Sequence, residues 1–157
     1  MNKKTAGALL FFLIAALLGS YVIPAMKKSY EKQEQSKATR IPQLITAQSD
    51  SWNNGDLSGF MSLYWKSDSL PFLTFSGVQY GWQRLYDSYQ KGYFESDAKR
   101  GQLKFEIEKM IPVESHVYLV PGSWTVSRQD TVLSGKFSLL FKFFENDGWK
   151  IIADHTW

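Results

Sequence analysis

The stretch GWKIIADHTW, residues 148–157, closes the chain and decides the fold. Side chains alternate faces along a β-strand, so one face of this strand is expected to carry Trp149, Ile151, Ala153, His155 and Trp157. Apart from His155 this face is apolar, and we therefore expect it to face a core or a cavity. A single titratable ring on an apolar face makes His155 the first candidate for a functional residue.

Composition limits the classes of protein that the chain can represent. The 157 residues suffice for one domain of ordinary size, and 16% of them are aromatic, which suits an apolar pocket. The net charge of +3 includes Lys3 and Lys4. Without these two, the chain has 16 basic and 15 acidic residues and is close to neutral. No basic stripe stands out, so nucleic acid is not an expected partner.

Several kinds of chemistry are not expected from the sequence. The chain has no cysteine, which excludes disulfides, thiolate metal sites and a cysteine nucleophile. Its two histidines lack the spacing of metal ligands, and no phosphate-binding glycine loop or serine elbow is present. We expect neither a metal nor a cofactor.

The N-terminus carries a targeting or anchoring signal. Residues 5–26 form an uncharged run of 22 residues, which as a helix is long enough to cross a bilayer. A secretory signal peptide is the alternative, since residues 6–18 form a hydrophobic region that Gly19-Ser20 could end. We divide the chain into an anchor or signal peptide (residues 1–26), a polar linker (27–39) and a domain (40–157).

The orientation of this segment rests on two opposing signals. The short tail with two lysines resembles a signal sequence that stays in the cytoplasm and exports the rest. The basic residues that follow the run favour the opposite topology under the positive-inside rule. We give the tail more weight and expect the domain to lie outside the cytoplasm, exported or held to the membrane through residues 5–26.

The domain reads as helices followed by strands. Helical periodicity covers residues 41–52, 57–64 and 81–94, with Asp56 as the N-cap of the second helix. Alternating or continuous apolar patterns predict strands at residues 71–75, 103–107, 113–126, 132–144 and 148–157, with a bulge at Pro121-Gly122. The pattern indicates an α+β domain in which three helices cover one face of an antiparallel sheet.

The opposite face of the sheet is also informative. Leu140, Phe144 and Ile152 would point away from the helices, and large outward apolar side chains suggest a partner surface. A locally covered patch is the alternative.

This order of elements resembles the nuclear-transport-factor-2-like (NTF2-like) superfamily, and within it the DUF4440 / SnoaL-like branch. The matching residues lie within residues 41–157. They are Trp52-Asn53, Gly55-Asp56-Leu57, Phe60-Met61, Tyr64, Gly81-Trp82, Tyr86, Tyr89, Gly122, Trp124, Gly135, Phe137 and residues 148–156. The resemblance implies a cone-shaped, curved sheet wrapped around helices with a pocket at its open end, and homodimers that pair through the sheet. The superfamily includes ketosteroid isomerases, scytalone dehydratases, polyketide cyclases and many proteins without known activity, so fold alone does not give the reaction.

The candidate site follows from the terminal strand and the helices that cover it. His155 is expected to act as a general acid or base, with Tyr64 and Tyr86 as hydrogen-bond donors to an oxyanion. The expected pocket wall consists of Trp82, Tyr89, Trp124, Trp149 and Trp157. For each of these side chains, packing in the core is the alternative. Asp154 is expected to point to the opposite face and to bond the backbone or a neighbouring strand.

Three functions remain open from the sequence. The first is a membrane-tethered or exported domain that binds a small, mostly apolar molecule. The second is a lyase or isomerase that uses His155 and a tyrosine. The third is an assembly module that dimerises through the sheet near the membrane.

Overall fold

The computed structural model describes residues 22–29, 32, 36–74 and 77–157. The chain divides into two compact units, Met1–Lys37 and Ala38–Trp157. In the first unit residues 22–29 are helical and exposed, while residues 1–21, which hold most of the expected anchor, lie outside the described residues. Among the residues described, no helix is both long and apolar enough to span a bilayer.

Two of the predicted helices begin the second unit. Helix α2 spans Ile41–Asn53 and buries Ile41, Ile45, Gln48 and Trp52, which confirms the helical spacing. Helix α3 spans Leu57–Ser62 and begins at Asp56, whose Oδ1 accepts a hydrogen bond from the Gly59 backbone N–H at 2.8 Å. The predicted N-cap is thus confirmed, because that carboxylate satisfies a donor that the helix leaves open.

The segment after α3 contains two elements that were not predicted from the sequence, strand β2 and helix α5. Strands β1 (Pro71–Thr74) and β2 (Gly77–Tyr80) form an antiparallel hairpin, where only the first strand was expected. Helix α4 (Trp82–Tyr93) confirms the third predicted helix. The short helix α5 (Asp97–Arg100) follows it, with the Ser96 hydroxyl accepting from the Lys99 backbone N–H.

The remaining strands build the sheet. They are β3 (Gln102–Ile107), β4 (Ile111–Glu114), β5 (Val117–Ser127), β6 (Val132–Phe144) and β7 (Gly148–Thr156). The order across the sheet is β2-β1-β7-β6-β5-β3, and β4 pairs with the far end of β5. Because β1 pairs with β7 in parallel, the sheet is mixed, and the expectation of a wholly antiparallel sheet is wrong.

Two local predictions about β5 are also wrong. The segment 113–126 is not one strand, since the chain turns between β4 and β5 at His116, whose φ of 63° is left-handed. The pairing of β5 with β6 runs without a register shift through Pro121 and Gly122, so no bulge lies there.

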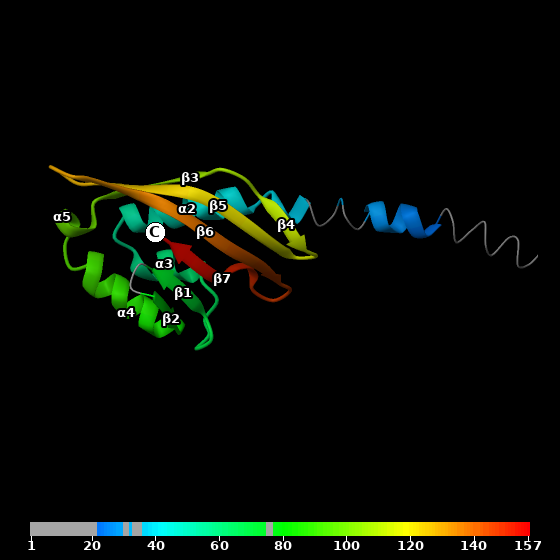
Figure 1. Ribbon diagram of the computed structural model, residues 1–157, viewed down its shortest axis with the longest axis horizontal. Coiled ribbons are helices and arrows are strands. Elements are labelled where there is room, and N and C mark those ends of the chain that lie inside the picture. Colours follow the sequence, from blue (N-terminus) through cyan, green and yellow to red (C-terminus); the bar gives the residue numbers. More distant parts are fainter. Residues whose placement is uncertain (1–21, 30–31, 33–35, 75–76) are drawn as a thin grey trace, which may run out of the picture. The chain divides into compact units, whose positions relative to one another are not determined.

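The core lies between the inner face of the sheet and the helices. Phe137, Leu139 and Phe141 alternate along β6 and are buried, as the sequence predicted for this face. Helices α2, α3 and α4 lie along one side of the curved sheet, which does not close on itself, and the chain ends near the middle of the domain (Figure 1). The predicted α+β class is confirmed.

Candidate functional site

A β-bulge in the terminal strand determines which side chain enters the interior. Leu140 of β6 pairs with Ala153 of β7, but the next residue, Phe141, pairs with Ile151. Ile152 is therefore an extra residue without a partner on β6, and it inverts the alternation of faces beyond it. Trp149 and Ile151 are buried as expected, but after the bulge Asp154 is buried and His155 is exposed. The prediction that His155 faces the interior is wrong.

The bulge occurs where β7 changes its partner. The Ile151 backbone N–H donates to the Leu63 carbonyl at 2.8 Å, and its carbonyl accepts from the Trp65 N–H at 2.9 Å. Three residues further on, Asp154 lies opposite Phe72 of β1 in the parallel pairing. Strand β7 thus pairs first with the segment after α3 and then with β1. The extra residue, Ile152, lets β7 change direction between these two partners.

Asp154 is the centre of a buried hydrogen-bond network. Its side chain is 5% exposed. The Tyr64 hydroxyl donates to Oδ2 at 2.7 Å, and the Thr156 hydroxyl donates to Oδ1 at 2.7 Å. Burial raises the pKa of Asp154, while the hydrogen bonds from Tyr64 and Thr156 and the charge of His155 oppose that rise. A carboxyl whose pKa is raised towards neutrality can accept or release a proton.

Two tyrosines extend this network towards the helices. Tyr64 follows α3, Tyr89 lies on α4, and both line the inner cavity beside Asp154. Burial, followed by the charge of Asp154, raises the pKa of both tyrosines well above the ordinary value of 10.0. Both hydroxyls therefore stay protonated over the physiological range and serve as hydrogen-bond donors.

An aromatic cavity of about 90 Å³ lies beside the carboxylate. Most of its wall is aromatic, and the rings come from both helices and sheet: Trp52, Phe60, Tyr64, Tyr89, Tyr93, Phe105, Trp124 and Phe137. The rings pack edge to face, with Phe60 and Tyr89 centroids 5.0 Å apart and Phe105 and Phe137 centroids 5.5 Å apart. Such contacts between rings fix the shape of the wall.

Two glycines make room for two of these rings. Gly122 on β5 lies opposite Phe137 on β6, and Trp124 lies opposite Gly135 in the same ladder. A Cβ at Gly122 would stand 2.4 Å from the Phe137 ring, and one at Gly135 would stand 2.8 Å from the Trp124 ring. Each strand thus supplies a ring that packs against a glycine of its neighbour, where a larger residue would collide with that ring and with a backbone carbonyl.

Two polar atoms in the cavity wall have no partner. Gln48 is buried and donates through Nε2 to the Phe60 carbonyl at 3.2 Å, but its Oε1 accepts no hydrogen bond. The Trp124 Nε1–H is likewise buried and donates to nothing. Buried polar atoms are normally satisfied, so one free acceptor and one free donor in the same cavity suit a bound polar molecule.

A second, outer cavity adjoins the first. Its volume is about 300 Å³, and it lies between the β1–β2 hairpin and α4. Tyr89, Tyr93, Asp154 and Thr156 belong to the walls of both cavities. These four side chains form the partition between the two spaces, which places the carboxylate within reach of both.

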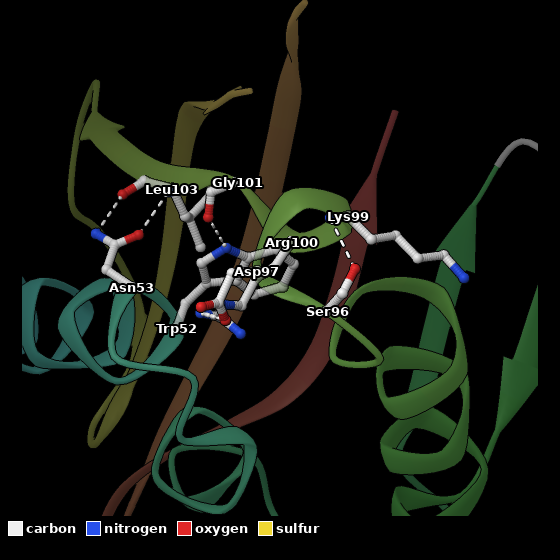
Figure 2. Close-up of polar contacts among 8 residues, drawn as sticks. All are labelled: Trp52, Asn53, Ser96, Asp97, Lys99, Arg100, Gly101 and Leu103. Carbon is white, nitrogen blue, oxygen red and sulfur yellow. Dashed lines mark hydrogen bonds and ion pairs between the residues drawn. The ribbon is translucent and has the colours of Figure 1, made fainter. Parts of the chain in front are cut away.

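Hydrogen bonds fix the wall of the inner cavity where α2 meets β3 (Figure 2). The Asn53 side chain accepts from the Leu103 backbone N–H at 2.7 Å and donates to the Leu103 carbonyl at 3.0 Å. Beside it, the Trp52 Nε1–H donates to the Gly101 carbonyl at 3.2 Å. Because Trp52 and Leu103 both line the cavity, these bonds hold two of its walls at a fixed separation.

Behind Trp52 a buried cation supports the same corner. The Arg100 guanidinium donates to Asp97 Oδ1 at 2.7 Å, as Figure 2 shows, and lies over the Phe94 ring at 5.5 Å. Gly55 lies against this guanidinium with a left-handed φ of 75°. The Arg100 side chain packs outside the cavity wall, so its role there is structural.

Three of the predicted site residues are found together. Tyr64, Tyr89 and Trp124 all line the inner cavity. Trp82 and Tyr86 instead pack on each other at 5.3 Å, and Trp149 packs against Tyr118 and Phe143.

The remaining two predicted residues lie outside the cavities. The His155 and Trp157 rings are exposed and lie 4.4 Å apart. The prediction that Trp157 lines the pocket used the same alternation of faces as that for His155. It is wrong for the same reason, because the bulge at Ile152 inverts that alternation.

Sequence reasoning missed Asp154, Thr156 and Gln48. The first two follow from the bulge, for which the only local signal is the pair of adjacent apolar residues Ile151 and Ile152. Gln48 gave a clearer signal, because it is a polar residue on the buried stripe of α2. No cluster of three His, Asp or Glu side chains that could hold a metal occurs in the described part of the chain.

Comparison with known proteins agrees with this architecture. No protein-family model matches the sequence, and no curated protein matches it. An NTF2-like protein of unknown function from Shewanella oneidensis is 30% identical, with a TM-score of 0.71 over 76% of this chain and 97% of that one. A cystatin-like-fold domain of unknown function from Nostoc punctiforme is 20% identical (TM-score 0.64, 77% and 76% covered). A ketosteroid isomerase-like protein from Erwinia carotovora is 16% identical (TM-score 0.55, 75% and 92% covered).

The identity and coverage of the Shewanella protein show the family. The mixed curved sheet and the helices that cover it are those of an NTF2-like domain. The chain belongs to the NTF2-like superfamily.

Proposed function

We propose that the domain binds a small, mostly apolar molecule in the aromatic cavity, with the polar group of that molecule at Asp154. The observation that carries the proposal is a buried carboxylate in the shared wall of two adjoining cavities that are otherwise lined mainly by rings and aliphatic side chains. An apolar pocket with a few convergent polar groups is the usual form of a small-molecule site. The free Gln48 Oε1 and Trp124 Nε1–H add an acceptor and a donor.

Two neighbouring residues on β6 allow a matched test. Leu133 is 37% exposed and lines the inner cavity, whereas Val132 is 65% exposed and lines neither cavity. Thermal shifts of the full-length chain would be measured against a library of small lipophilic molecules. We expect hits with the wild type that Leu133→Trp loses, because the indole fills the cavity, and that Val132→Trp keeps. A library without hits, or equal shifts in both variants, would contradict the proposal.

A proton-transfer enzyme of the lyase or isomerase class is the second candidate. The predicted base, His155, lies outside the cavity, but Asp154 lies in its wall, and burial raises the pKa of this carboxyl group in the direction that favours a general base. The Tyr64 hydroxyl already donates to Asp154, and Tyr89 is the protonated tyrosine beside it that can donate to an enolate oxygen. If this reading holds, the full-length chain will exchange α-protons of cyclohexanone with D₂O, and Asp154→Asn will not. Equal exchange by the two proteins would exclude Asp154 as the base.

Three further assignments are proposals as well. We infer that the chain belongs to the DUF4440 / SnoaL-like branch, on the strength of residues 148–156. We also infer that residues 5–26 anchor or export the chain, which places the domain outside the cytoplasm. An export-dependent reporter fused to the C-terminus tests this placement, and a reporter that works only in the cytoplasm would reverse it.

We further propose that two copies pair through the outer face of the sheet. Leu140 and Phe144 are half-buried there, and Trp157 is 40% exposed. Sedimentation of the full-length chain and of Leu140→Lys would test the pairing. We expect a dimer that the lysine dissociates, and a wild-type monomer at micromolar concentration would rule it out.

A further inference from the structure

The charge of the two cavities is one-sided. Asp154 is the sole acidic residue in their walls, and no lysine, arginine or histidine lines either of them. None of the ion pairs found in the described part of the chain includes Asp154. Buried charges in proteins are usually paired, since the loss of hydration has to be offset by a partner. The cavity thus lacks the cation that would complete it.

The walls around the carboxylate suit a cation. A continuous group of rings is formed by Trp52, Phe60, Tyr89 and Tyr93. The centroid of the Trp52 ring lies 5.1 Å from that of Tyr93 and 6.0 Å from that of Tyr89. The faces of aromatic rings attract positive charge, and groups of rings recognise organic ammonium ions in this way.

The cavity contains hydrogen-bond acceptors that are not fully used. An ionised carboxylate has about four acceptor positions, and Tyr64 and Thr156 use two of those on Asp154. Gln48 Oε1 is a further free acceptor. An ammonium group has donors only, so it matches this set. The Trp124 Nε1–H, a buried donor without a partner, leaves room for an oxygen elsewhere in the same ligand.

We propose that the ligand is a protonated organic amine whose ammonium group pairs with the Asp154 carboxylate, while its apolar body fills the ring-lined cavity. The inference rests on the proposed binding function and names the chemical class of ligand for that site. It goes beyond that function because a neutral alcohol or ketone of the same shape would also satisfy a merely apolar pocket.

Proton balance makes the inference testable. The groups that face Asp154 are Tyr64 after α3 and Tyr89 and Tyr93 on α4, and His155 adjoins it on β7. None of the tyrosines carries a positive charge, so an incoming ammonium is the strongest new stabiliser of the ionised carboxylate. Wherever Asp154 is protonated in the free protein, amine binding has to release that proton to solvent.

Three isosteric probes separate the ligand classes. Cyclohexylamine, cyclohexanol and cyclohexanone have the same size, but the first is cationic at pH 7, because aliphatic amines titrate near 10.4 like a lysine side chain. Isothermal titration calorimetry would be run on the full-length chain in two buffers of different ionisation enthalpy. The variants are Asp154→Asn and, as a matched control that removes the same charge from an exposed turn, Asp147→Asn.

The expected result is that cyclohexylamine binds the wild type at least about tenfold more tightly than either neutral probe, as a charge-assisted bond implies. Asp154→Asn should lose that preference and Asp147→Asn should keep it. The inference fails if a neutral probe binds as tightly as the amine, or if the amine does not bind. Binding of a neutral probe alone would leave the small-molecule function standing, whereas no binding by any probe would count against both. The wild-type comparison decides the matter even if Asp154→Asn does not fold.

Discussion

The hydroxyl of Tyr64 offers the sharpest test of the buried network by stability. In Tyr64→Phe the ring still packs beside Phe60, but Asp154 Oδ2 loses the donor that lies 2.7 Å away. Hydrogen bonds to charged groups contribute about 1.5–3 kcal/mol, and the acceptor left behind belongs to a residue that is only 5% exposed. We therefore expect the free energy of unfolding to fall by about 2 kcal/mol, which lowers the melting temperature by roughly 6–10 °C in a domain of this size.

The assay is urea unfolding of the full-length chain, followed by circular dichroism. Tyr86→Phe is the control, since Tyr86 is a half-buried tyrosine of the helical layer whose hydroxyl makes none of the hydrogen bonds found in the described residues. We expect that control to change stability by less than about 0.5 kcal/mol. In an Asp154→Asn background the cost of Tyr64→Phe should shrink to about 1 kcal/mol, because the acceptor is then neutral. Equal losses in Tyr64→Phe and Tyr86→Phe would refute the network.

Further predictions concern pH, packing and the cavity wall. Since the folded state binds the Asp154 proton more tightly than the unfolded state, wild-type stability should fall relative to Asp154→Asn as the pH rises from the ordinary aspartate pKa of 3.8 through the raised one. A difference in stability that stays constant between pH 3 and 8 would show that folding does not raise the pKa of this carboxyl group. Gly122→Ala should cost about 1–3 kcal/mol because its Cβ would meet the Phe137 ring, whereas Gly92→Ala on α4, with open space around it, should be neutral or stabilising by up to about 1 kcal/mol; denaturant midpoints compare the two, and equal effects would contradict the packing. Asn53→Ala should cost about 1–3 kcal/mol through the two lost bonds to Leu103 and should weaken ligand binding in calorimetry, and an unchanged midpoint would mean that the bonds do not hold the wall.

The helices could be predicted from the sequence because their signals are local. The apolar spacing of α2, the cap at Asp56 and the spacing of α4 each lie within one helix and act there. Helix α5 escaped prediction because four residues are too few for a period. The strand alternation of β6 was also local, and its buried face was correct.

The site could be predicted only in part. The tyrosines and Trp124 were found because large amphipathic rings on helices and strands tend to line cavities. Asp154 was missed because its orientation depends on the bulge at Ile152. That bulge occurs where β7 pairs with residues far away in the sequence, namely Leu63, Trp65 and β1. The sequence of the terminal stretch alone does not indicate those partners.

The position of the Asp154 carboxyl group is the claim on which the site depends. Its pKa can be measured directly by following the side-chain carboxyl carbon of the full-length, ¹³C-labelled chain by NMR from pH 2 to 9, with Asp147→Asn and Asp154→Asn to assign the signals. We predict a midpoint clearly above the ordinary 3.8, with a further upward shift in Tyr64→Phe. A midpoint at or below the ordinary value would show that burial does not dominate the pKa of this carboxyl group, and it would contradict the account.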